Sequence, residues 1–150
     1  MMTQVMVRIV GRDLPGADCG DHQDVHVGMQ RGTVQDAVVS ADAGEVVFEA
    51  PVTLVTAPDG TADFRGPHVQ GRRGGRFLYL TWGEQPPGGA FTMFRRAKLH
   101  LADIPATDLT AARDGGGCLQ GALGLTDASG LPLCASVHPP QVAWSVVPVR

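Results

Sequence analysis

Short runs in which apolar and polar residues alternate constrain the fold of this 150-residue chain more than any other feature. The first run spans Gln4–Val10. Its odd positions are apolar, so Val5, Val7 and Ile9 would share one face of a β-strand. Twenty glycines and eleven prolines separate such runs with frequent turns. The pattern predicts many short strands rather than long helices.

Further strands are expected along the chain. Pro51 interrupts the run Glu45–Thr56. Because proline cannot donate a ladder hydrogen bond, this run is expected to be an edge strand or two strands joined by a bulge. Phe77–Trp82 is apolar on both faces, which indicates a strand covered on each side. The other expected strands are Asp24–Arg31, Thr33–Val39, Phe91–Leu101 and Gln141–Val147.

One segment, near residues 106–114, has the pattern of a short helix. Thr107 or Asp108 could cap its start, and Gly115–Gly117 would end it. About eight to ten short strands with one short helix predict an all-β fold. We expect an antiparallel β-sandwich or a β-barrel, built as a single domain over residues 1–150.

The composition indicates a folded domain with its own core. Hydrophobic residues make up 43% of the chain and charged residues 18%, which argues against disorder throughout. No apolar run reaches the ~20 residues that a membrane helix needs. The N-terminus also lacks the features of a signal peptide. A cytoplasmic protein without a membrane partner is therefore expected.

The three cysteines are an odd number, which favours reduced thiols. Asp127–Gly130 has the composition of a tight turn, so a hairpin is expected between Cys118–Thr126 and Leu131–Val137. In that hairpin Cys134 would lie several residues from the position that faces Cys118. The two thiols would then be too far apart for a disulfide.

Positive charge is concentrated in Phe64–Leu101. Seven bases and one acid, Glu84, give this segment a net charge of +6, although the whole chain carries −3. Guanidinium groups match the geometry of carboxylates and phosphates, so the segment favours an anionic ligand or partner. The alternative is a solvated face whose arginines pair with aspartates elsewhere. The candidate ligand-binding residues are Arg72, Arg73, Arg76, Arg95, Arg96 and Lys98.

Arg95 falls among apolar positions of its strand. A buried, unpaired arginine is costly, so Arg95 must pair with a carboxylate, line a cavity or lie at a strand end near water. Tyr79 and His100 are weak candidates for proton transfer in catalysis. Gly71–Gly75 resembles a backbone anion nest, although a plain β-turn is the simpler interpretation.

Several familiar chemistries lack support. Cys19, His22 and His26 have a spacing that zinc could use, but no second pair of ligands follows, so no metal site is predicted. The chain has no P-loop, no dinucleotide-binding glycine motif and no GxSxG, so no cofactor and no hydrolase triad are predicted. Nucleic acid is disfavoured because the isoelectric point is about 5.9 and no recognition motif is present.

Several stretches resemble a family of small, mostly actinobacterial proteins of unknown function. They are VRIVGRDLPG, VHVGMQR, FRGPHVQGRRGGRFLYLTWG, FTMFRRAKLHL and LGLTDASGLPLCASVHPP, and together they cover most of the chain. The resemblance implies a free-standing bacterial protein. The family has no established activity, cofactor or catalytic residues, so the resemblance assigns no role to any residue.

Two functions remain open. The first is a cofactor-independent domain that binds an anionic small molecule, with or without enzymatic activity, in a pocket beside the central Arg-rich hairpin. The second is an interaction module that docks an acidic protein through its basic face, or forms a homodimer through an edge strand. If Arg95 and Tyr79 converge in an enclosed cavity, the ligand is favoured. A flat, exposed basic face favours the protein partner.

Overall fold

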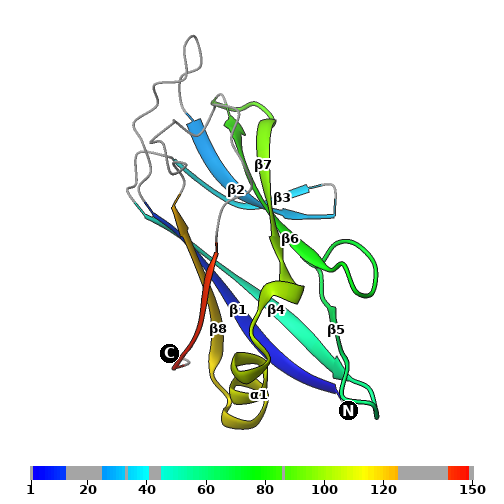
Figure 1. Ribbon diagram of the computed structural model, residues 1–150. Helices are drawn as coiled ribbons and strands as arrows, with labels where there is room; N and C mark the ends of the chain where they lie inside the picture. Colours follow the sequence, from blue (N-terminus) through cyan, green and yellow to red (C-terminus); the bar gives the residue numbers. More distant parts are fainter. Residues whose placement is uncertain are drawn as a thin grey trace.

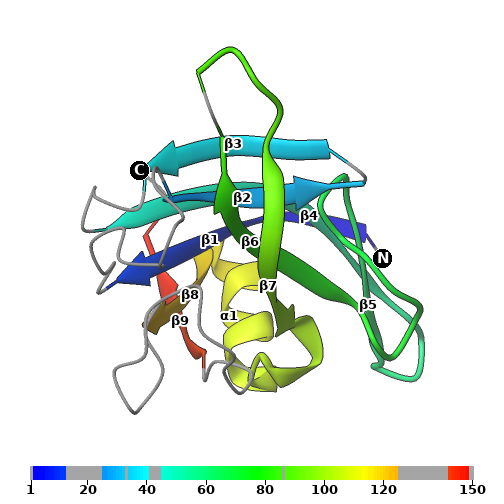
Figure 2. The same cartoon turned by 90° about the horizontal axis from the view of Figure 1, so that it is seen from above.

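Alternating residues build two β-sheets that pack face to face (Figures 1 and 2). The computed structural model describes residues 2–12, 25–32, 34–40, 45–85, 87–124 and 142–148, apart from the side chains of residues 25, 35, 37, 40, 82 and 92–97. Nine strands lie within this part of the chain. The predicted all-β fold is confirmed. Since the strands form two separate sheets, the sandwich is the alternative that the described residues support.

The larger sheet has the strand order β5-β4-β1-β8-β9, and the smaller has β3-β2-β6-β7. The strands of the larger sheet are β1 (Met2–Arg12), β4 (Val46–Thr56), β5 (Ala62–Arg65), β8 (Cys118–Gly124) and β9 (Ala143–Val147). Those of the smaller sheet are β2 (Val25–Arg31), β3 (Val34–Ser40), β6 (Phe77–Glu84) and β7 (Thr92–His100). One pairing departs from the predicted antiparallel sandwich, because β1 runs parallel to β8. Alternation alone does not determine the direction of a neighbouring strand.

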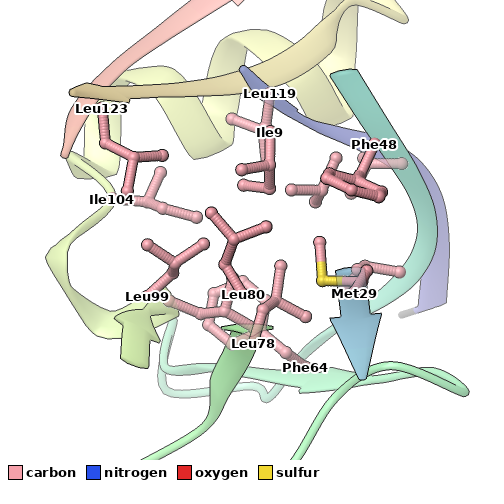
Figure 3. Packing of buried hydrophobic residues seen from close by; sticks show 14 of the residues in the cluster. Ile9, Met29, Phe48, Phe64, Leu78, Leu80, Leu99, Ile104, Leu119 and Leu123 are labelled. Atoms are coloured by element: carbon pink, nitrogen blue, oxygen red, sulfur yellow. The ribbon is translucent and has the colours of Figure 1, made fainter. Parts of the chain in front are cut away.

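The core lies between the sheets and follows the predicted alternation. Val7 and Ile9 of β1 are fully buried, and so are Leu78 and Leu80 of β6. Figure 3 shows Ile9 pointing from the larger sheet toward Leu78 and Leu80 in the smaller one. β6 is an internal strand between β2 and β7, as its apolar residues on both faces predict.

The prediction for the run that contains Pro51 is wrong. β4 is one continuous, internal strand whose ladder with β1 has no register shift. β5 pairs only with Thr53–Thr56, so Pro51 lies beyond the end of that ladder. The C=O of Pro51 faces Gly66, just after β5, and the nitrogen of the same residue points to the same side. The missing N–H therefore breaks no hydrogen bond to β1.

The predicted helix is α1 (Ala106–Gly115), which lies beside β8 and β1 at one end of the larger sheet (Figure 1). It follows a 3-10 turn, η2 (Leu101–Asp103). Gly116 ends it with φ of 70°, as predicted. The predicted cap is wrong: Pro105 occupies the N-cap, no side chain caps the helix, and Thr107 and Asp108 lie inside the first turn. No helix within the described residues is long and apolar enough to cross a bilayer.

The predicted partner of β8 is corrected where that strand is described. Cys118–Ala122 pair with Ala143–Val147 of β9, and β1 lies on the other side of β8. Leu131–Val137, the other strand of the predicted hairpin, lies outside the described residues. Gly121 faces Trp144, and a Cβ on Gly121 would lie 2.9 and 3.0 Å from carbons of the indole ring. Cys19, Cys134 and the turn at Asp127–Gly130 lie outside the described residues.

The close approach of Trp144 to Gly121 predicts a specific loss of stability. Gly121→Ala should lower the free energy of unfolding by about 1–3 kcal/mol, because the added methyl group meets the indole ring. Gly115→Ala is the matched control, because nothing lies within 4 Å of a Cβ there. Urea denaturation measures both. Equal effects of the two substitutions would contradict the packing of Trp144 on Gly121.

Candidate functional site

A small hairpin connects the two sheets and carries the first candidate arginines. It projects from the edge of the sandwich (Figure 1). Its ends are Gln70 and Phe77, whose backbone N–H groups donate to each other's C=O at 2.8 and 3.1 Å. At its tip, the N–H of Gly75 donates to the C=O of Arg72 at 2.8 Å and closes a β-turn. Arg72 and Arg73 are exposed on this turn.

Two glycines allow this hairpin to close. Gly74 has φ of 86° and Gly71 has φ of 85°, values that residues with a Cβ rarely adopt. A Cβ on Gly71 would also lie 2.5 Å from the C=O of Gly75 and 2.8 Å from the ring of Phe77. The simpler interpretation of this stretch, a β-turn, therefore describes its geometry. The turn lies directly against the Phe77 ring.

Arg76 is engaged within the chain. Its Nε donates to Oδ1 of Asp63 at 3.1 Å, its Nη2 donates to Oδ2 at 3.4 Å, and its Nη1 donates to the C=O of Gly71. The Asp63 side chain is 8% exposed. The hydrogen bond from Arg76 lowers the pKa of Asp63, although burial opposes this shift. Arg76 thus follows the alternative interpretation, in which an arginine of the basic segment pairs with an aspartate elsewhere.

Four side chains meet on the outer face of β6 and β7. Lys98 Nζ lies 4.5 Å from the centroid of the Phe77 ring, which is a cation–π geometry. Tyr79 and His100 each stand edge-on to the same ring, with centroids 4.7 and 6.3 Å away. The strand register causes this grouping, because it pairs Phe77 with His100 and Tyr79 with Lys98. Three residues predicted for the site, Tyr79, Lys98 and His100, are therefore brought together.

These groups differ in access to solvent. Tyr79 is buried, at 8% exposure, whereas Lys98 and His100 are exposed. Arg72 and Arg73 continue the positive charge from the adjacent turn, with Phe77 between the turn and Lys98. We call Arg72, Arg73, Lys98 and His100, with the ring of Phe77, the basic surface.

An acidic turn borders the basic surface. Arg73 Nη2 donates to Oγ1 of Thr61 at 3.4 Å, and Thr61 in turn donates to Oδ1 of Asp59 through its hydroxyl and its backbone N–H. These bonds from Thr61, and then the charge of Arg73, lower the pKa of Asp59. Asp59 therefore places a negative charge beside the basic surface.

The remaining two candidates are known only by their backbone. Arg95 pairs with Trp82 and Arg96 with Thr81, next to a register shift between Trp82 and Gly83. The side chains of Arg95 and Arg96 lie outside the described residues. The convergence of Arg95 and Tyr79 in an enclosed cavity, which would favour a small ligand over a protein partner, therefore stays a prediction.

His68 is a buried polar residue that the sequence analysis missed. It is 5% exposed, and its Nε2 donates to Oδ2 of Asp36 on β3 at 2.9 Å. Its Nδ1 is buried without a hydrogen-bond partner in the described part of the chain. Gly66 and Pro67 before it do suggest a fixed loop, but no local pattern indicates a carboxylate 32 residues earlier. The pair holds the loop after β5 against β3.

The structure offers little for metal or thiol chemistry where it is described. No three His, Cys, Asp or Glu side chains group as metal ligands there. Cys19 and His22, from the spacing that zinc could use, lie outside that part. Cys118 is a free, buried thiol, and burial raises its pKa, so it is not an activated nucleophile.

Comparison with known proteins identifies a family but no activity. Residues 5–147 match a family model described as a family of unknown function, DUF5990. The chain belongs to this family. No curated protein and no solved structure matches it. The predicted resemblance to a family of unknown function is thus confirmed.

The ion pair between Asp63 and Arg76 predicts a pH-dependent contribution to stability. Asp63→Asn should lower the free energy of unfolding at neutral pH by about 1–3 kcal/mol, because it weakens a partly buried charged hydrogen bond. The folded-state pKa of Asp63 is lowered, so this contribution is complete above the ordinary aspartate pKa. It is lost as the pH falls through the folded-state value. Denaturation at a series of pH values measures the difference.

Asp114→Asn is the matched control for this experiment. Asp114 pairs with Arg113 on the exposed surface of α1, where solvent screens the interaction. It should change stability little at any pH. A gap between wild type and Asp63→Asn that persists unchanged into strong acid would mean that the loss comes from packing rather than from the charge.

Proposed function

We propose that the chain is a protein-interaction module that binds an acidic partner through the basic surface. The observation that carries the proposal is that Lys98 and His100 are exposed beside a half-buried aromatic ring. Arg72 and Arg73 extend the charge on the neighbouring turn and are exposed as well. Such a surface offers carboxylates several cations at once and offers apolar groups one aromatic contact.

The chemistry of the surface favours weak, salt-dependent association. An exposed ion pair contributes only ~0.2–1 kcal/mol, so several must act together. An aromatic ring that becomes covered in the complex adds more, and aromatic residues are common among those that dominate binding energy. The positive field also raises the association rate with an acidic partner, and salt reduces it.

Charge reversal tests the proposal. The probe is a fluorescein-labelled oligoglutamate, followed by fluorescence anisotropy at about 20 mM salt, where screening is weak. Lys98→Glu should weaken binding about tenfold, because it replaces an attraction by a repulsion. Arg12→Glu is the control, because Arg12 lies on the other sheet beside Glu45. If the two reversals weaken binding equally, the attraction belongs to the whole chain and not to the basic surface.

An anionic small molecule is the second candidate. It is favoured by the grouping of Lys98, His100 and Tyr79 around one ring, which suits an aromatic carboxylate or phosphate. In an enzyme of this kind Tyr79 or His100 would transfer protons, and Lys98 would hold the anion.

Thermal unfolding with a panel of organic phosphates and carboxylates tests the second candidate. A ligand of the folded state raises the midpoint with concentration, by ~2.7 kcal/mol of stability at a hundredfold excess over Kd. The shift should be lost in Lys98→Ala and kept in Arg12→Ala. No shift with any compound would exclude the small-anion candidate within that panel.

A further inference from the structure

The outer edge of β7 carries backbone groups directly beside the basic surface. β7 is the last strand in the order β3-β2-β6-β7, so among the described residues it pairs with β6 on one side and with no strand on the other. It has nine residues, and the other edge strands of the two sheets, β3, β5 and β9, have seven, four and five. It is therefore the longest strand edge in the described part of the chain.

The hydrogen-bond pattern shows which residues of β7 face that edge. In an antiparallel pair every second residue bonds to the partner strand. The N–H of Leu101 donates to the C=O of Arg76 at 3.0 Å, and the register continues without a shift from His100 back to Arg95. Leu101, Leu99 and Ala97 therefore face β6. The residues whose N–H and C=O point to the outer edge are Arg96, Lys98 and His100.

These three residues are also basic, so one stretch of edge combines positive charge with backbone groups that pair with no strand in the described part of the chain. We propose that the acidic partner presents an extended segment that adds to the smaller sheet along this edge. The inference rests on the proposed function and specifies the form of the partner. Backbone hydrogen bonds would give affinity, and acidic residues at every second position would lie across from Lys98 and His100.

A second copy of this chain is a poorer occupant of the edge. Two β7 strands side by side would bring their bases close together, and like charges opposite one another destabilise a sheet. Lysine on an edge strand ordinarily prevents such pairing. The same charges favour a strand that carries glutamate or aspartate. The register shift between Trp82 and Gly83 limits the continuous stretch to Arg95–His100, which leaves room for a segment of about six residues.

The experiment compares peptides that differ only in their backbone. The first probe is a labelled peptide of about eight residues that alternates glutamate and threonine. Two further probes have the same sequence with N-methyl groups on either the odd or the even residues. Strand addition uses one edge of the peptide, so one methylated probe should lose at least about tenfold in affinity and the other should lose much less. Binding is measured by anisotropy on the wild-type chain.

Two variants of the protein provide a matched test in which the peptide is kept unchanged. Lys98→Thr and Lys98→Pro both remove the ammonium group, but only proline also removes the outward N–H. Proline is tolerated at an edge position whose N–H faces away from the sheet, so the ladder with β6 should survive. Lys98→Pro should bind the unmethylated peptide several-fold more weakly than Lys98→Thr. Thermal unfolding verifies that both variants are folded.

Each outcome supports or overturns a stated claim. If the three peptides bind equally and the two variants agree, the partner is held by charge alone, and strand addition is wrong while the proposed function stands. If no acidic peptide binds at low salt, both fail. If Lys98→Pro does not fold, the methylated peptides still decide the question on the wild-type chain. A wild-type dimer in sedimentation that is lost in Lys98→Pro would mean that a second copy occupies the edge, contrary to the inference.

Discussion

The crossover between the two sheets is held by one charged contact, the pair between Asp63 of β5 and Arg76, just before β6. It joins the larger sheet to the smaller one at the point where the chain crosses between them. Two donors of Arg76 reach the carboxylate of Asp63 and compensate its burial, and a third donates to the C=O of Gly71. The ladders of β6 with β2 and β7 set its register. A slip of one residue would exchange the buried Leu78 for Phe77 and remove the ring from the basic surface.

Much of the fold could be predicted because strand faces are a local property of the sequence. The burial of Val7, Ile9, Leu78 and Leu80 follows from alternation alone. The failures concern information that no local pattern holds. Pro51 is harmless in an internal strand because its nitrogen faces the side where β5 has ended. The pairing of β8 with β9 depends on Trp144 lying over Gly121, whereas the composition of the intervening turn suggested a closer partner.

The candidate site, like the fold, could be predicted only in part. Lys98 and His100 could be predicted as a basic face, since they occupy the polar positions of an alternating strand. Their contact with Phe77 follows once β6 and β7 are paired. The two partly buried polar pairs could not be found from the sequence. Arg76 and Asp63 are 13 residues apart, and His68 and Asp36 are 32 apart, so only the folded chain brings them together. That difference separates arginines that stabilise the protein from bases that remain available to a partner.

The parallel pairing of β1 with β8 has a consequence for how the protein is made. All four strands of the smaller sheet leave the ribosome before β8 does, and β1 leaves first of all. β1 can bond to β4 early, but its other edge stays open until more than a hundred further residues have been synthesised. Contacts so distant in sequence form slowly. Until β8 emerges, the nascent chain would therefore expose one edge of β1, and we expect its yield in cells to depend on chaperones that cover such edges.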